Sequence, residues 1–429
     1  INEWPLRPSY GGLSVCFAEK EKDYTLLYCF LICRKMEFYM NDDSDAWDDT
    51  SPSTFKEFPS LTKTQRHAIR GLADYGLKTD AYQHRDKKIK DVVKEHVLPF
   101  LPAKSLMKFK AVSKEWDKWI ASPLLTHQQS FSCQSFSGYF YQDMNMGWDT
   151  NAMFLSVDHS TSGVPRPALD FFPEVVKILS SCSGLLLCQG SEKYYVCNPA
   201  TQDWKILPPP QYYHGAEPAV VLAFEPSLRN IEAYYHVICA FPMLDQPIIG
   251  FEIYSSESNT WSCSSAYCTD IENPGLLCGG LYMKGVAYYE TKSNEALAFH
   301  VKDEISAIIS LPVQVGRHGS LTQIDGELCY VTANNECGNV FLIDIYQGME
   351  MSLKRSVSIN LGPDRSYTRA CKVLPCVDAV AIHSGIYIYI YHLREQKVES
   401  IGRSCAMGPT KKFLPYINSL AMLHELKEL

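Results

Sequence analysis

Residues 183–210 (SGLLLCQGSEKYYVCNPATQDWKILPPP) contain two apolar runs separated by polar turns, and this pattern decides the fold class of most of the chain. The runs at 185–188 and 194–197 are short, rich in Leu, Tyr and Val, and bounded by Gly, Ser, Asn and Pro, which is typical of β-strands. The second run leads through a turn to Trp204. The stretch therefore predicts a small antiparallel unit.

Similar units recur from about residue 150 to the end of the chain. They include AYYHVICAF with IIGFEIYSSESNTWSCSS, GGLYMKGVAYYET with ALAFHVKDEISAIISLP, DGELCYVTAN with VFLIDIYQGMEMSL, and DAVAIHSG with IYIYIYHLREQKVESIG. They start roughly 45–60 residues apart, at or somewhat above the length of a propeller blade. We expect an all-β, propeller-like domain of about five to six blades over residues 150–425, with Trp204 and Trp261 at similar positions in two of them.

Length and composition limit the number of domains and the class of protein. A chain of 429 residues favours two domains, and 46% apolar with 21% charged residues is ordinary for a globular protein. A net charge of −8 argues against a nucleic-acid-binding surface spread over the whole molecule. The sixteen cysteines are scattered without zinc-like spacing. Those in strand-like runs, such as Cys188 and Cys239, are expected to be reduced and buried.

The N-terminal part has a different character. Residues 1–85 form a poorly defined segment, in which the acidic stretch 41–54 reads as disordered. The apolar run Tyr24–Cys33 has about half the length of a membrane span, so no membrane contact is expected. The chain begins with Ile1, and Met36 and Met40 are possible true starts.

Residues 89–123 (IKDVVKEHVLPFLPAKSLMKFKAVSKEWDKWIASP) predict three short amphipathic helices. Ile89, Val93 and Val97 recur at helical spacing, and the prolines at 99 and 102 end that helix. Ser113 is a plausible N-cap of the third helix. Helices this short cannot bury their apolar faces on one another alone, so they are expected to need a partner.

This segment resembles the F-box, whose core reads LP-x-K-S-L-x-R-F-x-x-V-S-K-x-W. The matching residues here are Leu101, Pro102, Lys104, Ser105, Leu106, Phe109, Val112, Ser113, Lys114 and Trp116, with Lys108 in place of Arg. Val93, Val97 and Leu98 take the aliphatic positions of the first helix. Ile89 and Lys90 stand where the family has its opening Leu-Pro pair, which in the family touches the adaptor.

The β region resembles the plant F-box-associated domain. Its "C-N-G-L-L … N-P-x-T-x-x-W-x-x-L-P" pattern is matched by Ser183, Gly184, Leu185, Leu186, Asn198, Pro199, Ala200, Thr201, Trp204, Leu207 and Pro208. The strand pair "V-Y-S-S-x-T-x-x-W" is matched by Ile253, Tyr254, Ser255, Ser256 and Trp261, and the closing "P-Y-x-x-S-L" by Pro415, Tyr416, Ser419 and Leu420.

The resemblance implies an α+β multidomain protein with a small three-helix F-box at 86–125, a linker at 126–149 and the propeller-like domain after it. It also implies the substrate-recognition subunit of an SCF ubiquitin ligase, located in the nucleus or the cytoplasm. Its F-box would bind an acidic adaptor and, through it, cullin, by means of Ile89, Val93, Val97, Leu98, Leu101, Pro102, Leu106, Phe109, Val112, Trp116 and Ile120.

The positive charge of the F-box-like segment agrees with an acidic adaptor as its partner. Ten Lys or Arg stand against five Asp or Glu between Arg85 and Lys118, a net charge of +5. A nucleic acid would also suit a basic surface, but no aromatic interleaving accompanies it, so no nucleic-acid partner is expected. Steering toward an acidic adaptor is the better explanation.

Catalytic signatures are missing from the sequence, with no phosphate loop, nucleophile elbow or HExxH helix. We therefore expect no enzyme activity, no cofactor and no metal. The target protein is expected at the loops 211–217 (QYYHGAE), 242–247 (PMLDQP) and 317–319, above all at Tyr212, Tyr213 and His214. An alternative function is an F-box-containing interaction scaffold that acts outside any ligase, which the changed Leu-Pro pair favours.

Overall fold

The computed structural model describes residues 89–143, 151–157, 164–165, 167–227, 230, 233–243, 248–269, 275–312, 319–337, 340–361, 371–403 and 411–423. The segment expected over residues 1–85, with its acidic stretch 41–54, lies outside these ranges. The chain divides into two compact units, residues 1–93 and 94–429, and nearly all described residues belong to the second unit.

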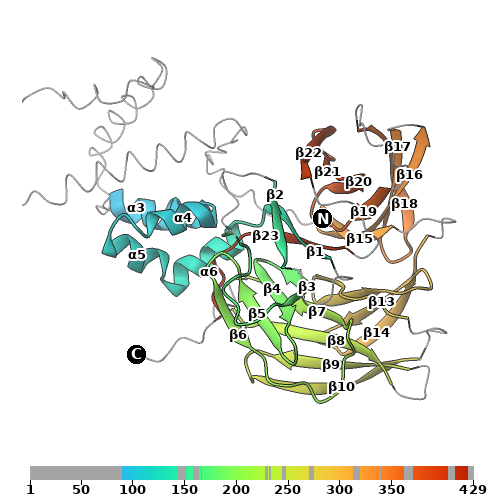
Figure 1. The fold of residues 1–429 in the computed structure, drawn as a ribbon, viewed down its shortest axis with the longest axis horizontal. Coiled ribbons are helices and arrows are strands. Elements are labelled where there is room, and N and C mark those ends of the chain that lie inside the picture. Colours follow the sequence, from blue (N-terminus) through green and yellow to red (C-terminus); the bar gives the residue numbers. More distant parts are fainter. Residues whose placement is uncertain are drawn as a thin grey trace, which may run out of the picture. The chain divides into compact units, whose positions relative to one another are not determined.

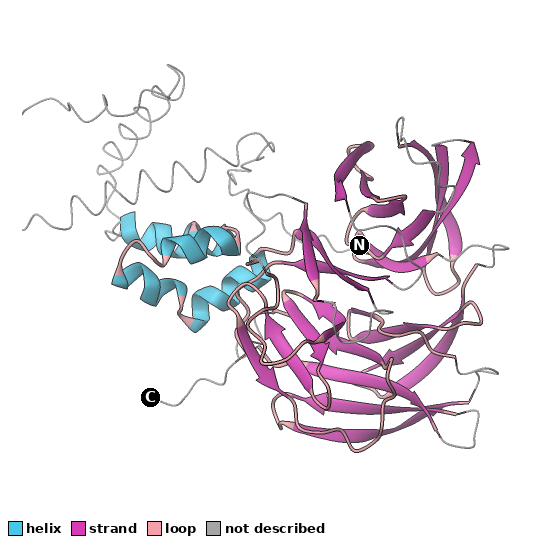
Figure 2. Cartoon of the chain, in the orientation of Figure 1, coloured by secondary structure: helices cyan, strands magenta, loops and turns pink. Residues whose placement is uncertain are grey.

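Short helices occupy the first part of the described chain, and strands make up the rest (Figure 2). The helices are α3 (Ile89–His96), the 3-10 turn η4 (Leu98–Phe100), α4 (Ala103–Phe109), α5 (Lys114–Ile120) and α6 (Pro123–Ser132). As the sequence predicts, Ser113 caps α5, because its Oγ accepts a hydrogen bond from the backbone N–H of Trp116 at 3.2 Å.

Six antiparallel sheets follow (Figure 1). From inner to outer strand, blade I holds β23 (Lys411–Ile417), β1 (Phe136–Asp143) and β2 (Met153–Ser156), and blade II holds β3 (Lys177–Cys182), β4 (Leu185–Gln189), β5 (Tyr194–Asn198) and β6 (Asp203–Ile206). Blade III holds β7 (Ala219–Ala223), β8 (His236–Pro242), β9 (Ile249–Ser255) and β10 (Thr260–Cys268), and blade IV holds β11 (Leu281–Met283), β12 (Val286–Glu290), β13 (Glu295–His300) and β14 (Ile305–Ser310). Blade V holds β15 (Ser320–Ile324), β16 (Glu327–Cys337), β17 (Val340–Gln347) and β18 (Ser352–Asn360), and blade VI holds β19 (Cys371–Leu374), β20 (Val380–Ser384), β21 (Tyr387–His392) and β22 (Lys397–Arg403).

These sheets form a six-bladed β-propeller, which narrows the expected five to six units to six. One hydrophobic cluster fills the space between each pair of neighbouring blades. The first lies between blades II and III, the second between III and IV, and the others complete the circle back to blades I and II. The strands therefore bury both faces, which explains their nearly continuous apolar runs.

The turns between third and fourth strands repeat from blade to blade. In blades II to VI, four residues join these strands, and the last of the four has a positive φ: Gln202, Asn259, Glu304, Met351 and Gln396. Because this turn has the same length in each of these blades, the residues that follow it occupy equivalent positions in the outer strands. Trp204 and Trp261 are each the second residue of the outer strand, paired with Cys197 and Tyr254. This agrees with the equivalence that the sequence predicts.

The ring closes in blade I, where the last strand pairs with the first. β23 is antiparallel to β1, with Tyr139 opposite Pro415 and Tyr141 opposite Phe413. The residues that follow β23 form hydrogen bonds with blade II. Ser419 Oγ donates to the carbonyl of Ser183 at 2.9 Å, and Asn198 Nδ2 donates to the carbonyls of Ser419 and Ala421 at 3.0 and 2.8 Å.

The domain boundaries differ from the sequence-based expectation. The segment expected as a linker, residues 126–149, contains most of α6 and all of β1, which is the middle strand of blade I. The propeller therefore begins at Phe136 and not near residue 150. The misplacement has a physical cause, because β1 finds its partner, β23, almost the whole domain later in the sequence, and no local pattern reveals such a pairing.

Candidate functional site

The predicted adaptor-binding residues fall into two groups in the structure. Apart from Val93, six are buried within the chain itself: Leu98, Leu101, Leu106, Phe109, Trp116 and Ile120. Their rings and branched chains pack the helices together, for example Phe109 against Trp116 with ring centroids 5.8 Å apart. These six side chains therefore have a role in stabilising the helices, and their contact with a partner stays a prediction.

Three of the remaining predicted residues are more accessible. Val97, Pro102 and Val112 are half-buried, and Val93 is buried. Ile89 begins α3, and its side chain lies outside the described residues. A partner that approaches these helices from solvent can reach the half-buried group directly, without any change in packing.

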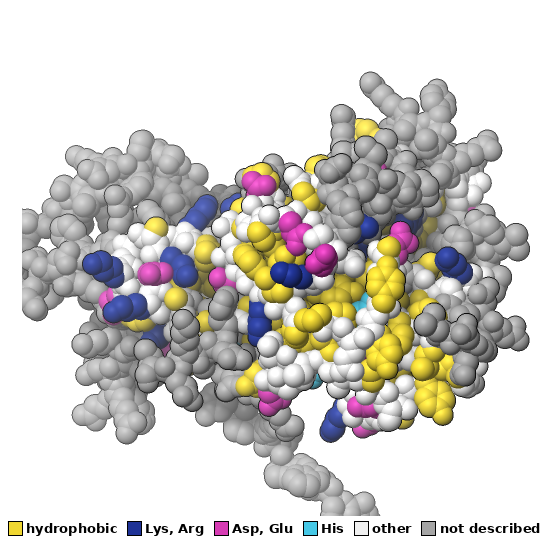
Figure 3. Space-filling model, turned by 60° about the horizontal axis from the view of Figure 1, so that its bottom comes forward, with side chains coloured by type: hydrophobic (Ala, Val, Ile, Leu, Met, Phe, Trp, Pro, Cys, Tyr) yellow, Lys and Arg dark blue, Asp and Glu magenta, His cyan; other side chains and the backbone are white. Residues whose placement is uncertain are grey.

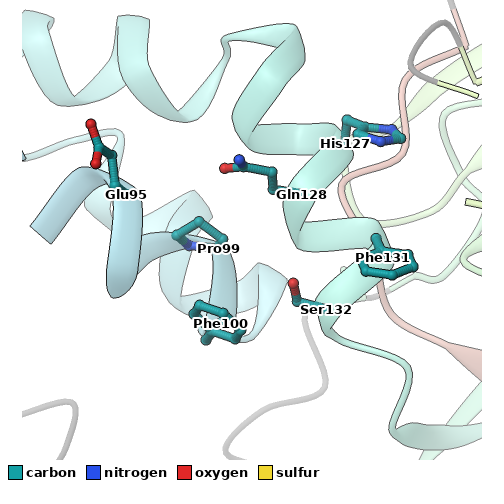
Figure 4. Close-up of a pocket in the computed structure, with 7 residues that line it drawn as sticks. All are labelled: Glu95, Pro99, Phe100, His127, Gln128, Phe131 and Ser132. Carbon is teal, nitrogen blue, oxygen red and sulfur yellow. The ribbon is translucent and has the colours of Figure 1, made fainter. Parts of the chain in front are cut away.

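The most exposed apolar side chains of the described helices are Phe100, Leu124 and Phe131, which sequence reasoning did not select. Phe100 in η4 is 62% exposed, and Phe131 in α6 is 49% exposed. They line an open pocket of about 200 Å³ together with Glu95, Pro99, His127, Gln128 and Ser132 (Figure 4). The sequence could have indicated Phe100 as a contact residue, because it is a large aromatic residue between two Leu-Pro pairs.

Basic side chains lie on the outside of the same helices. Lys108, Lys114 and Lys118 are exposed, while Lys110 lies 3.9 Å from Asp117 in a partly exposed ion pair. Lys94 lies 5.4 Å from the centre of the Trp119 ring. The positive charge that the sequence predicts is therefore available to attract an acidic partner.

Gln129 in α6 joins this helical segment to the end of the propeller. Its side chain is fully buried, its Nε2 donates to the carbonyl of Leu101 at 3.4 Å, and its Oε1 accepts from the backbone N–H of Leu420 at 2.8 Å. Leu420 lies between Ser419 and Ala421, whose carbonyls are bonded to Asn198 of blade II. A continuous set of buried hydrogen bonds thus runs from η4 and α4 to the propeller.

The loops expected to bind the target share one end of the propeller. In an antiparallel blade, the connection into the first strand and the connection between the second and third strands lie at the same end. The connections 207–218, 243–248 and 311–319 are of these two kinds. Residues 244–247 and 313–318 of the second and third connections lie outside the described residues, so the first one is available for analysis in full.

The connection 207–218 is held by the carboxylate of Glu252, which is fully buried on β9. Its Oε1 accepts from the backbone N–H of Gln211 at 2.7 Å, and its Oε2 accepts from the backbone N–H of Tyr212 at 3.2 Å. Gln211 Nε2 also donates to the carbonyl of Trp261 at 2.9 Å. Such bonds to a buried carboxylate are strong, and they define the path of this loop.

His214 completes that network and does not face solvent. Its side chain is only 2% exposed; Nε2 lies 2.9 Å from Glu252 Oε2, and Nδ1 lies 3.1 Å from Tyr194 Oη. This pattern assigns a neutral ring that donates through Nε2 and accepts through Nδ1. Burial lowers the pKa of His214, although the bond to Glu252 acts in the opposite direction. In this structure, therefore, the predicted contact residue His214 supports the loop from inside.

The two neighbouring tyrosines do face solvent. Tyr213 is 86% exposed, and Tyr212 is 48% exposed and stacked on Phe241 with ring centroids 5.1 Å apart. Of the three residues predicted to bind the target, two can therefore reach a partner and the third holds them in place. Sequence reasoning identified the loop but not the buried Glu252, which lies about forty residues later.

Thiol chemistry and metal binding find little support among the described residues. Burial raises the pKa of Cys182 and Cys329 to about 11, and it raises the pKa of the exposed Cys263 as well. A thiol that accepts a group by nucleophilic attack needs the opposite shift. Within the described ranges, no His, Cys, Asp and Glu side chains gather as a metal site, and no helix is long and apolar enough to cross a membrane.

The comparisons with known proteins agree with this architecture. The sequence profile of the F-box associated beta propeller domain matches residues 143–345. F-box protein At5g07610 of Arabidopsis thaliana is 26% identical over 63% of this chain and 70% of its own length. F-box protein At5g49610 of the same plant is 28% identical over 63% and 79%, and F-box protein At5g41720 is 31% identical over 29% and 73%.

Proposed function

Because this chain belongs to the plant F-box proteins that carry an F-box-associated β-propeller domain, we propose that it is the substrate-recognition subunit of an SCF ubiquitin ligase. In this proposal α3, α4 and α5 are the F-box and bind the acidic adaptor and, through it, cullin. The propeller binds the target protein. We place this assembly in the nucleus or the cytoplasm, as the family resemblance implies.

One observation carries the proposal, namely the presence of both parts in a single chain. The LP-x-K-S-L run at Leu101–Leu106 lies among helices that carry exposed lysines, and a propeller that matches the family profile follows it. The protein itself would make and break no bonds. Its contribution would be proximity, because a bound target lysine is held at high effective concentration beside a charged ubiquitin-conjugating enzyme.

The test is affinity purification of the full chain from plant cells, followed by mass spectrometry. The proposal expects adaptor and cullin peptides in the purified material. Leu106→Ala should abolish their recovery, because truncation of this fully buried side chain costs about 2–5 kcal/mol of helix packing. Leu124→Ala in α6 removes the same side chain from an exposed position and is the matched control.

Lys108→Glu combined with Lys114→Glu tests the same contact without disturbing the core, since both lysines are exposed. Reversal of these charges should slow adaptor association, most clearly at low salt. Adaptor recovery that is unchanged in the double variant and in Leu106→Ala would contradict the assignment of these helices as an adaptor-binding F-box.

A scaffold that acts outside any ligase is the second candidate, and Ile89–Lys90 is the observation that favours it. The family has Leu-Pro at these positions, where it touches the adaptor. Replacement of both residues by Leu and Pro separates the two functions. A receptor should bind the adaptor before and after this change, whereas a scaffold should bind it only afterwards.

A further inference from the structure

Four exposed apolar side chains lie at one end of blade III, the end that also carries the loop 207–218. They are Tyr212, Tyr213, Met243 and Tyr267, and they are 48%, 86%, 44% and 61% exposed. We call these four residues the blade III rim. Figure 3, which turns the bottom of Figure 1 forward, shows hydrophobic side chains gathered on that side of the propeller.

Strand register places three parts of the rim in one row. Tyr267 on β10 pairs with Gly250 on β9, and Gly250 pairs with Phe241 on β8. Directly paired residues of antiparallel strands point to the same face of a sheet. Tyr267 and Phe241 therefore flank a position that has no side chain. Tyr212 extends the row, because it stacks on Phe241.

Because Gly250 has no side chain, the Phe241 ring packs closely over the backbone of β9 at this point of the row. A Cβ at that position would lie 3.3 Å from the Phe241 ring and 3.6 Å from Met243 Cγ. These two side chains thus lean over the glycine from one side, while Tyr267 stands on the other. The rim therefore presents a row of neighbouring aromatic side chains, a surface on which an apolar side chain of another protein can pack.

The rim is preorganised by the interior of the blade. The bonds from Glu252 to the backbone of Gln211 and Tyr212 hold the loop before any partner arrives. Trp261 Nε1 adds a bond to the carbonyl of Pro208 at 2.8 Å. Binding therefore costs little ordering entropy at Tyr212, whose backbone is held by Glu252 and whose ring stacks on Phe241, and a tyrosine held in this way is typical of binding hot spots.

Formal charge differs between the two halves of the propeller. Residues 171–310, which form blades II, III and IV, contain seven Lys or Arg and fifteen Asp or Glu, a net charge of −8. Blades I, V and VI span residues 136–170 and 311–423, which contain twelve Lys or Arg and thirteen Asp or Glu, a net charge of −1. A partner that docks on blade III therefore enters a negative field, which attracts cationic side chains.

From these observations we infer that the blade III rim binds an extended, basic segment of the target, in which Arg or Lys side chains flank an apolar residue. The apolar residue would pack on the aromatic row between Tyr212 and Tyr267, and the cations would lie over the faces of Tyr213 and Tyr267. This inference rests on the proposed function, since it names the kind of target that the receptor recognises.

A peptide titration of the purified full chain tests the inference without any adaptor. The probe is a fluorescein-labelled peptide, Gly-Ser-Arg-Leu-Arg-Leu-Arg-Ser-Gly, and binding is measured by fluorescence anisotropy at low salt. One matched peptide has citrulline for each arginine, which keeps the shape and removes the charge. A second has glutamate for each arginine, and a third has serine for each leucine.

We expect the arginine peptide to bind on the order of tenfold more tightly than the citrulline and serine peptides, and the glutamate peptide to bind least. Tyr213→Ala and Tyr267→Ala should each weaken the arginine peptide by on the order of fivefold. Tyr234→Ala is the matched control. It removes a partly exposed tyrosine just before β8, at the opposite end of the same blade, and should leave affinity unchanged.

Three results would overturn the inference: no binding of the arginine peptide up to about 1 mM, equal binding of the arginine and citrulline peptides, or equal losses from Tyr213→Ala and Tyr234→Ala. Adaptor recovery is measured on the same variants and should stay unchanged. If the unchanged chain binds the arginine peptide but no adaptor, the proposed function is wrong and the rim is still a peptide-binding surface.

Discussion

Glycine is required at position 184 for two reasons. The backbone there has a positive φ, and a side chain would collide with Ser419, which is distant in sequence. With Ser183, Gly184 forms the turn between β3 and β4, where Ser183 and Gly184 have φ values of 44° and 94°. A Cβ at Gly184 would lie 1.9 Å from Ser419 Oγ, in the segment that follows β23. The "C-N-G-L-L" and "P-Y-x-x-S-L" patterns thus meet in space, which explains why both kinds of residue occur in one domain.

Gly184→Ala should therefore be much more destabilising than an equivalent change in an open turn. Gly348→Ala is the control, because Gly348 also has a positive φ, 81°, but a Cβ there meets nothing within 4 Å. The control should cost about 1–2 kcal/mol for the backbone alone. Gly184→Ala should lower the urea midpoint several times further, and equal midpoints would contradict the contact with Ser419.

His214 makes the stability of the fold depend on pH. Its side chain is enclosed by Glu252, Tyr194, Phe241 and Trp261, and its burial disfavours the imidazolium form. The folded-state pKa of His214 is therefore lowered from its ordinary value of 6.5. A lowered pKa means that the unfolded chain binds the proton more readily than the folded chain does.

We expect the contribution of His214 to be fully present above pH 6.5 and to be lost as pH falls through 6.5 toward the folded-state pKa. The slope is at most about 1.4 kcal/mol per pH unit for one proton. Urea unfolding between pH 7.5 and about 5 measures it. His214→Gln should be less stable overall but should have a flatter slope, whereas His96→Gln, at an exposed position, should keep the wild-type slope.

At the scale of elements, α6 acts as the connection between the helices and the propeller. Gln129 is buried and uses both ends of its amide, toward Leu101 on one side and Leu420 on the other. Without it, the buried N–H of Leu420 would lose its acceptor, and the carbonyl of Leu101 would keep only the weak bond from Cys133 Sγ at 3.6 Å. A buried unsatisfied group costs about 1–3 kcal/mol. This single residue therefore ties together elements that are about 290 residues apart in the chain.

Gln129→Leu should accelerate hydrogen exchange at the backbone N–H of Leu420 and in the segment 418–421, because that amide loses its acceptor. Gln128→Leu is the matched control, since Gln128 is the neighbouring residue and is half-buried. Exchange measured by mass spectrometry should rise in the first variant only. Protection at 418–421 that is unchanged in Gln129→Leu would show that the propeller holds this segment without α6.

At the scale of the whole molecule, stability depends on closure of the ring. β23 supplies the inner strand of blade I and contributes to two of the six clusters between blades, through Phe413 on one side and Tyr416 on the other. Removal of this strand would expose the faces of blades II and VI and the backbone of β1. An open sheet edge and two uncovered apolar faces favour aggregation.

A chain that ends before Lys411 should therefore lose its cooperative unfolding transition and become sensitive to protease throughout the propeller. A chain that ends after Leu423 keeps β23 and the bonds to Asn198, and it serves as the control. Limited proteolysis and thermal unfolding distinguish the two chains. A compact, protease-resistant core in the shorter chain would contradict a propeller that depends on this closure.

The sequence by itself determined the elements of this protein and their repetition. Alternating apolar runs, Asp-Gly and Ser-Gly turns and the regular spacing predicted blades, and the LP-x-K-S-L segment predicted helices, because these signals lie between residues close together in the chain. The loop 207–218 was also predicted, since Tyr212 and Tyr213 are aromatic residues in a turn-rich stretch.

Only the tertiary structure decided what depends on residues far apart. The pairing of β1 with β23 moved the start of the propeller to residue 136, and the buried Glu252 turned His214 from an expected contact into an internal support. The row of Tyr212, Phe241 and Tyr267 arises from strand register across three strands. Burial, register and ring closure are properties of assembled sheets, and no local run of residues encodes them.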